Sequence, residues 1–287
     1  MNTAGKATVA LVAGALAAVA VAQGQGVARV GLASPWVELN AARVRLVAGA
    51  PAKKPAKSYL AGVEVTLDEG WKTYWRTPGD AGVPPAFDWT SSTNVAAIKV
   101  LYPAPSRMAE AGAQSIGYRR AVTFPVEVEP SDAGKPVDLK LSMEFGVCRE
   151  ICIPAEAAIA LTLRPAQLEG DAAPALVAAL EQVPRPQGRR RASDPELTRV
   201  TAKLDGARPH LSIEARFPRG DAADAFVEAP EGLYVPLPKR LADAADGTLR
   251  FEIDLSRGDL ARDLTAKTLT LTLVSAAGAT EATWTAP

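Results

Sequence analysis

Residues 137–145 read Val-Asp-Leu-Lys-Leu-Ser-Met-Glu-Phe, an alternation of apolar and polar side chains with a period of two. Because successive side chains of a β-strand point to opposite faces of a sheet, this pattern predicts a strand with one buried and one solvated face. Residues 63–67, 122–128 and 159–163 show the same alternation. Several such strands with turns between them predict an antiparallel, immunoglobulin-like β-sandwich.

The alternation stops near residue 165 and returns after Pro195, in residues 211–217, 249–255 and 269–273. These later runs predict a second β-sandwich. The sequence therefore indicates an all-β fold with two immunoglobulin-like domains, residues 34–165 and 195–287. A short helical, proline-rich linker, residues 166–194, is predicted between them.

The predicted linker combines a helix signal with a polar stretch. Asp171 is placed to cap a short helix. The apolar face of this helix is predicted to carry Leu176, Val177, Leu180 and Val183. Residues 187–195 are polar and include three consecutive arginines. We interpret them as a solvated connector rather than a nucleic-acid-binding patch, because residues 1–22 predict an exported chain, which rarely meets nucleic acid.

The N-terminus has the features of a signal for export. Lys6 supplies a positive charge, residues 9–21 are apolar and rich in alanine, and Ala20-Val-Ala22 matches an A-x-A cleavage site. We expect residues 1–22 to be a signal peptide cleaved near Ala22, which places the mature chain in the bacterial periplasm. The alternative is an uncleaved membrane anchor.

The composition argues against several classes of function. The chain has 32 basic and 32 acidic side chains, so no net field directs it to nucleic acid or anionic lipid. His210 is the single histidine, and it has no nucleophile near it in sequence, which argues against histidine-based hydrolases and histidine-rich metal sites. We expect no cofactor and no small-molecule substrate.

The two cysteines of the chain, Cys148 and Cys152, lie within the stretch Phe-Gly-Val-Cys-Arg-Glu-Ile-Cys-Ile-Pro of residues 145–154. Flanking strands would place them at disulfide distance in a tight hairpin. In the chain-entropy model, so short a loop gains roughly 2 kcal/mol, against about 4.7 kcal/mol for a 100-residue loop. The pair is therefore either redox-active or a weakly stabilising structural disulfide. A third reading is Cu(I) bound by both thiolates, with Met143 or Met108 as a soft third ligand.

Local sequence favours Cys148 as the more ionised thiol. Arg149 follows it and would stabilise its thiolate. Ile151 and Ile153 flank Cys152, where desolvation would raise the pKa and protect the thiol. Gly146 is expected to form a β-bulge that redirects the strand before Cys148.

Three separated motifs then resemble one family. Residues 70–89 (GWKTYWRTPGDAGVPPAFDW), residues 117–120 (GYRR) and residues 146–154 (GVCREICIP) are similar to the periplasmic N-terminal domain of the DsbD/ScsB family of protein-disulfide reductases. The resemblance spans about residues 34–165. The second predicted sandwich more weakly resembles the additional immunoglobulin-like module of ScsB-type proteins.

The resemblance implies a mechanism. Cys148 and Cys152 would take electrons from a DsbD/ScsB/CcdA-like membrane transporter and pass them to periplasmic thioredoxin-fold proteins by thiol–disulfide exchange. In the family the second cysteine attacks the client, which implies Cys152 as the nucleophile, in contrast to the local argument for Cys148. Full-length members also have membrane helices and a thioredoxin-like domain, so a separate membrane partner is expected. The ScsB branch is linked to copper tolerance.

Aromatic residues are expected near the cysteine pair. Family members cover it with a cap loop that carries an aromatic side chain, and the matching residues 110–118 lack phenylalanine, so Ile116 or Tyr118 would serve. Tyr74 or Trp75 is expected to limit solvent access.

Arg76 and Asp80 are expected to pair with each other in the same loop region.

The alternative to a disulfide reductase is a non-enzymatic envelope adaptor in which the disulfide is structural and the sheet edges bind a partner.

Overall fold

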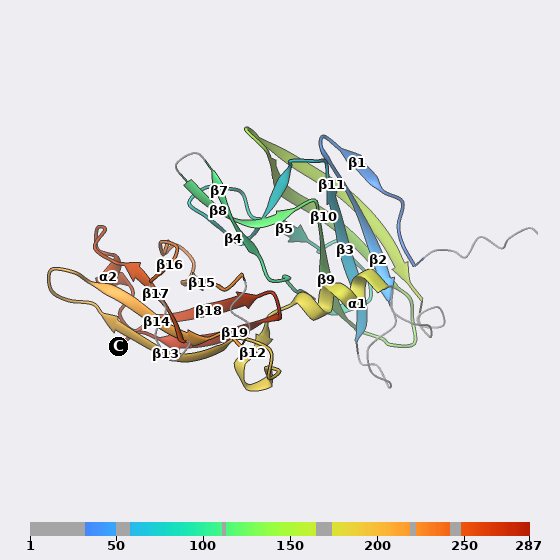
Figure 1. The fold of residues 1–287 in the computed structure, drawn as a ribbon. Helices are drawn as coiled ribbons and strands as arrows, with labels where there is room; N and C mark the ends of the chain where they lie inside the picture. The colour runs from blue at the N-terminus through green and yellow to red at the C-terminus, as the bar shows by residue number, and fades with distance from the viewer. Residues whose placement is uncertain (1–31, 50–57, 111–112, 165–173, 219–221, 242–247) are drawn as a thin grey trace, which may run out of the picture. The chain divides into compact units, whose positions relative to one another are not determined.

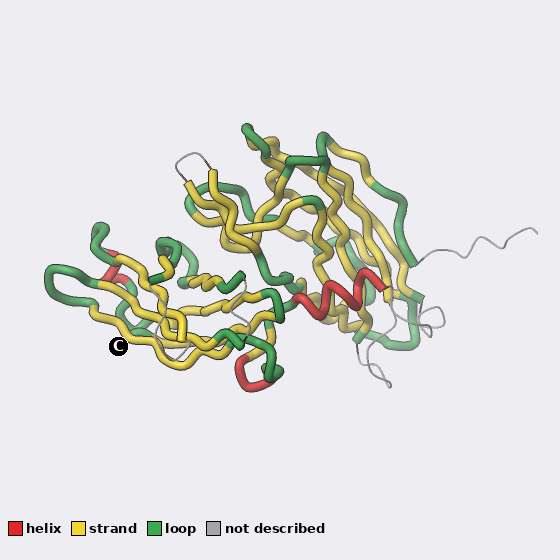
Figure 2. The backbone as a smooth tube through the Cα atoms, in the orientation of Figure 1, coloured by secondary structure: helices red, strands yellow, loops and turns green. Residues whose placement is uncertain are grey.

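The computed structural model describes residues 32–49, 58–110, 113–164, 174–218, 222–241 and 248–287. Strands account for most of these residues, and the predicted all-β fold is confirmed (Figures 1 and 2). Two sheets are formed before residue 165 and two after residue 184. No helix in the described ranges is long and apolar enough to cross a membrane. The predicted signal peptide, residues 1–22, lies outside the described residues.

The first pair of sheets contains the cysteines. One sheet has the order β1-β2-β3-β9-β6, with β1 Val37–Leu39, β2 Ala42–Gly49, β3 Tyr59–Leu67, β9 Ala121–Pro130 and β6 Val95–Val100. The other has the order β11-β10-β4-β8-β7, with β11 Cys152–Leu163, β10 Val137–Cys148, β4 Lys72–Gly79, β8 Ala113–Arg119 and β7 Ser106–Glu110. The short strand β5, Ala86–Asp88, also pairs with β10.

The period-two pattern produces the core of this sandwich. Val63 and Val65 of β3, Phe124 of β9 and Leu139 of β10 are almost completely buried in one apolar cluster. Their neighbours along each strand point to the opposite face of the sheet, as the alternation predicts. Burial of these side chains is the main favourable contribution to folding.

The hairpin of β10 and β11 has one uninterrupted register, from Val137 opposite Leu163 to Cys148 opposite Cys152. The expected β-bulge at Gly146 is therefore wrong for this ladder, in which Gly146 lies directly opposite Pro154. The glycine instead permits a close approach, since a Cβ atom there would lie 3.1 Å from the ring of Tyr74.

The second pair of sheets follows the connector. One has the order β12-β19-β18-β15, with β12 Arg185–Pro186, β19 Gly278–Thr285, β18 Thr268–Ser275 and β15 Asp224–Glu228. The other has the order β13-β14-β17-β16, with β13 Glu196–Lys203, β14 His210–Arg216, β17 Thr248–Asp254 and β16 Lys239–Arg240. A short helix, α2 (Leu260–Asp263), precedes β18. The inward residues Ile213, Phe251 and Leu271 belong to a separate apolar cluster.

The predicted linker helix is α1, Pro174–Gln182, which lies beside β9 (Figure 1). Leu176 is fully buried and packs close to Gly62 of β3. Val177, predicted on the same face, is exposed, and Ala179 is buried in its place. The predicted capping residue, Asp171, lies outside the described residues.

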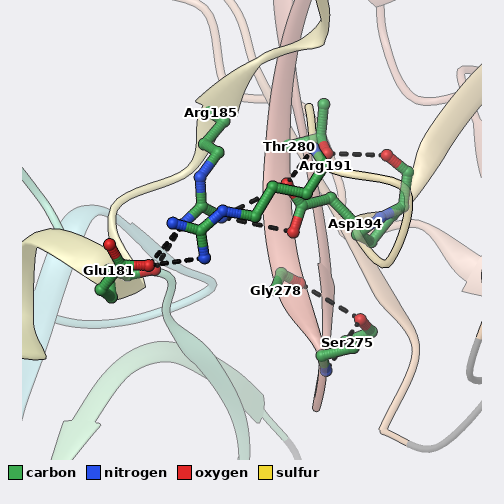
Figure 3. A network of polar contacts seen from close by, with 9 residues as sticks. Glu181, Arg185, Arg191, Asp194, Ser275, Gly278 and Thr280 are labelled. Atoms are coloured by element: carbon green, nitrogen blue, oxygen red, sulfur yellow. Dashed lines mark hydrogen bonds and ion pairs between the residues drawn. The ribbon is translucent and has the colours of Figure 1, made fainter. Parts of the chain in front are cut away.

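The arginine-rich stretch, residues 187–195, is largely exposed, as its polarity suggested, but Asp194 and Pro195 within it are buried. Arg185 begins β12, which pairs in parallel with β19, and a 3₁₀ turn η2, Gln187–Arg189, follows. Arg185 bonds Asp194 and Glu181, and Arg191 bonds Glu181 (Figure 3). Asp194 is 0% exposed. Arg185, which precedes the stretch, and Arg191 within it thus pair with Glu181 of α1, and Arg185 also pairs with the buried Asp194.

Candidate redox site

The β10–β11 hairpin ends in a disulfide bond. β10 ends at Cys148 and β11 begins at Cys152, so the two residues face each other across the last rung of the ladder. Their sulfur atoms are bonded, and their Cα atoms are 4.1 Å apart. The turn between them is closed by the Arg149 N–H, which donates to the carbonyl oxygen of Ile151.

The two cysteines differ sharply in exposure. Cys148 is 1% exposed, because β10 lies inside its sheet with β11 on one side and with β4 and β5 on the other. Cys152 is exposed, at the start of the edge strand β11. The expectation that neighbouring isoleucines bury Cys152 is wrong, because the turn directs Ile151 outward, with 68% exposure. Cys152 is therefore the sulfur that another protein can reach.

Tyr74 of β4 is the aromatic residue placed at this sulfur. Its side chain is 1% exposed, and its hydroxyl oxygen lies 3.2 Å from Cys152 Sγ. A disulfide sulfur carries no proton, so the tyrosine hydroxyl donates this hydrogen bond. Burial raises the pKa of Tyr74, which keeps the phenol protonated and able to donate at neutral pH.

Two glycines make room for the Tyr74 ring. A Cβ atom at Gly82 would lie 2.4 Å from the ring, and φ at this residue is +139°, a conformation that favours glycine. On the other side, Gly146 permits the approach described above. The adjacent Val83 is 54% exposed. Tyr74 is thus held between the loop after β4 and the end of β10.

The structure also places the other predicted site residues. Trp75, Ile116 and Tyr118 are buried in the core of the first sandwich, where Tyr118 packs edge-on against Phe124. A direct role of these three residues at the disulfide stays a prediction. The guanidinium of Arg149 lies over the ring of Trp71, 5.6 Å from its centroid.

The proposed copper site loses one of its suggested ligands. Met143 precedes Cys148 by five residues on β10, a separation of about 16 Å along a strand. The odd spacing also directs the two side chains to opposite faces of the sheet. Met143 therefore cannot complete a site formed by the two thiolates. Met108 is buried on β7, opposite Ser115.

Lys72 is a neighbour of the disulfide that sequence reasoning missed. It pairs directly with Cys148 across β4 and β10, and with Arg119 across β4 and β8. Directly opposed residues share a face of the sheet, so Cys148, Lys72 and Arg119 form a row. Lys72 is 3% exposed, and its burial, together with the charge of Arg119, lowers its pKa. The alternation in Trp-Lys-Thr-Tyr-Trp, which places Lys72 with Tyr74, was the available signal.

The pairing expected between Arg76 and Asp80 is wrong. Arg76 bonds Glu228 and Glu281, and Asp80 accepts hydrogen bonds from Tyr234 and from the backbone of Gln114. Glu228, Glu281 and Tyr234 lie between 152 and 205 residues away in sequence, beyond the reach of a local argument.

Comparison with known proteins agrees with this geometry. Residues 43–164 match the family model of the N-terminal domain of the thiol:disulfide interchange protein DsbD, and residues 182–287 match a family described as a domain of unknown function. No curated protein sequence matches the chain. The crystal structure of the N-terminal periplasmic domain of ScsB from Proteus mirabilis is similar, with a TM-score of 0.67 and 24% identity. The match covers 89% of this chain and 98% of that one.

The fold and the bonded cysteine pair define a β-sandwich of the thiol–disulfide interchange class. Residues 43–164 match the model of the DsbD N-terminal domain family. The likeness to the ScsB structure, at this identity, is one of fold and extends over both sandwiches.

Proposed function

We propose that this chain is a periplasmic thiol–disulfide interchange protein that relays electrons through Cys148 and Cys152. The observation that carries the proposal is a disulfide with one exposed and one buried sulfur at the end of a hairpin. The match of residues 43–164 to the DsbD N-terminal domain family supports the chemistry. The periplasmic location of the similar ScsB domain supports the compartment.

The first half of the cycle loads electrons onto the pair. A thiolate of a DsbD/ScsB/CcdA-like membrane transporter attacks Cys152 Sγ, the Cys148–Cys152 bond breaks, and Cys148 leaves as a thiolate. The second thiol of the transporter then attacks its own sulfur in this mixed disulfide and releases Cys152. Two electrons have moved to the cysteine pair, and the transporter leaves as a disulfide.

The second half delivers the electrons to a client. The Cys152 thiolate attacks the disulfide of a periplasmic thioredoxin-fold protein, and one client sulfur leaves as a thiolate. Cys148 then attacks Cys152 Sγ, re-forms the internal disulfide and frees the second client thiol. The client gains two electrons and two protons.

Tyr74 and the exposed apolar side chains assist these steps. The Tyr74 hydroxyl donates to Cys152 Sγ, and a hydrogen bond of this kind stabilises a thiolate more than a thiol. Val83 lies next to Gly146, and Ile151 precedes Cys152, so both provide exposed apolar surface near the reacting atom. A thioredoxin-fold partner can bury this surface when it docks.

The reduction potential of the Cys148–Cys152 pair tests the proposal. The purified protein is equilibrated in glutathione or dithiothreitol redox buffers, and its thiols are trapped and counted. A relay is expected to have a potential near those of other envelope thiol carriers, whereas a structural disulfide typically lies below about −300 mV. A pair that is reduced only when the fold melts would contradict the relay.

A further inference from the structure

The two sandwiches contact each other within residues 32–287, and the first contact is apolar. Phe226 of β15 packs against Trp75 of β4, with the ring centroids 5.8 Å apart. Both side chains are almost completely buried, and Phe226 belongs to the core cluster of the first sandwich. One aromatic side chain of the second sandwich thus completes the core of the first.

Next to this contact, strand β4 is bound by two carboxylates. Arg76 donates from Nε and Nη2 to the two oxygens of Glu228, at 2.8 and 2.7 Å, and from Nη2 to Glu281, at 2.5 Å. The hydroxyl of Thr77 also donates to Glu228, at 3.0 Å. Bidentate guanidinium–carboxylate pairs fix geometry as well as adding attraction. Glu228 therefore fixes two consecutive residues of β4.

Two further contacts hold the end of β4 and the β7–β8 hairpin. Arg107 of β7 donates to both oxygens of Asp224, at 3.0 and 2.7 Å. The Tyr234 hydroxyl donates to Asp80, whose other oxygen accepts the backbone N–H of Gln114. We refer to Asp224, Glu228 and Tyr234 of the second sandwich as the clamp.

The residues that the clamp binds lie close in sequence to Tyr74, which contacts the disulfide. Arg76 lies two residues after Tyr74 on β4. Asp80 lies two residues before Gly82, which packs on the Tyr74 ring. The clamp therefore holds the chain on both sides of the segment that encloses Tyr74. We propose that the clamp positions Tyr74 against Cys152, so that the second sandwich tunes the reactivity of the cysteine pair.

Polar contacts, rather than dense packing, carry this part of the interface. A cavity of about 600 Å³ is lined by Asp224 and Tyr234 of the clamp and by Asp80 and Arg107. The cavity leaves Asp80, Arg107 and their partners room to move when a charged contact is removed, while Phe226 still packs on Trp75. Loss of a clamp side chain should therefore shift β4 and weaken the hydrogen bond from Tyr74.

The test compares the Cys152 thiol pKa in matched variants of the full chain. Reduced protein is alkylated with iodoacetamide across a pH series, and Cys152 modification is followed by peptide mass. Tyr74→Phe removes the donor and is expected to raise the Cys152 pKa by about one unit. Glu228→Gln is expected to shift it in the same direction by a smaller amount. The double variant should then match Tyr74→Phe alone.

Glu214→Gln is the matched control. It removes an ion pair with Arg250 in the same sandwich, outside the contacts with β4, and is expected to leave the Cys152 pKa unchanged. Tyr234→Phe is a milder clamp variant that retains the ring, and its melting temperature reports folding. The proposal is overturned if Glu228→Gln and Tyr234→Phe both leave the pKa unchanged, or if the Glu228→Gln shift adds in full to that of Tyr74→Phe.

This inference deepens the proposed redox function, and its biological meaning rests on that function. The assay contains no client and no transporter. An unchanged Cys152 pKa in the clamp variants would therefore reject positioning while leaving the relay intact. If the clamp variants do shift the Cys152 pKa but the cysteine pair fails to exchange with clients, positioning would be supported and the relay rejected.

Discussion

The hairpins β10–β11 and β18–β19 are built alike and end differently. Both are long antiparallel pairs with uninterrupted registers, from Val137–Leu163 to Cys148–Cys152 and from Thr268–Thr285 to Ser275–Gly278. The first closes with a covalent bond beside an exposed sulfur. The second closes with a hydrogen bond from the Ser275 hydroxyl to the Gly278 carbonyl, next to a buried carboxylate. One end carries a disulfide with an exposed sulfur, whereas the other is held by buried polar contacts.

Removal of either cysteine should have the largest effect at the first end. Cys148→Ser leaves the accessible Cys152 without a resolving partner, so a mixed disulfide with a thioredoxin-fold client should accumulate. Cys152→Ser should yield essentially none, because the remaining sulfur is buried. Non-reducing electrophoresis with a client that retains one active-site cysteine measures both. Equal trapping by the two variants would contradict the assignment of Cys152 as the nucleophile.

Removal of the buried carboxylate should have the largest effect at the second end. Asp194 is fully buried and bonds Arg185 and the backbone N–H of Arg191 (Figure 3). Asp194→Ala removes one of the two carboxylates that bond the largely buried Arg185. Breaking a buried pair typically costs about 3–5 kcal/mol, which is the upper limit here because Glu181 still bonds Arg185. Denaturant unfolding measures the change. Glu214→Ala, which breaks a partly exposed pair, should cost less than about 1 kcal/mol.

Reduction of the disulfide should have a smaller effect on stability than loss of Asp194. The closed loop contains five residues, for which the chain-entropy model gives roughly 2 kcal/mol. Unfolding of oxidised and reduced protein in the same denaturant series measures the difference. A loss larger than that of Asp194→Ala would show that the disulfide is structural and would remove the contrast between the two ends.

Loss of the charge beside Cys148 should have the smallest effect. Lys72→Met removes a cation that shares a sheet face with this sulfur, which should destabilise the reduced pair. The reduction potential is then expected to fall by up to about 30 mV, the equivalent of one pKa unit. Lys140→Met, at an exposed position of β10, is the matched control. An unchanged potential in Lys72→Met would show that the row of cations does not act on Cys148.

The comparison also shows what the sequence could predict. Alternation alone predicted β10, β11 and their hairpin, because one buried face imposes a period of two. The exposures of the two cysteines could not be obtained in this way. They depend on which strand lies at the edge of the sheet, and the isoleucines around Cys152 suggested burial. Edge and interior are set by non-local pairing, here of Cys148 with Lys72.

Charged residues were the least predictable. Arg76 and Asp80 lie close in sequence, yet each finds a partner in the second sandwich. Residues 187–195 are largely exposed, as their polarity suggested, but polarity says nothing about long-range pairing. The pair of Arg185 with the buried Asp194, beside Gly278 of β19, could not be predicted from it. Tyr74 was among several aromatic candidates. It is distinguished from Trp75 by the sheet face that it shares with Lys72 and by the loop that contains Gly82.

The single exposed sulfur has a kinetic consequence for the proposed relay. Donor and acceptor must both react at Cys152, so the protein can hold only one of them at a time. Turnover should follow a ping-pong scheme, in which parallel double-reciprocal lines are expected when the two partners are varied. A large excess of either partner in its already-reacted form should occupy the site and slow the exchange with the other.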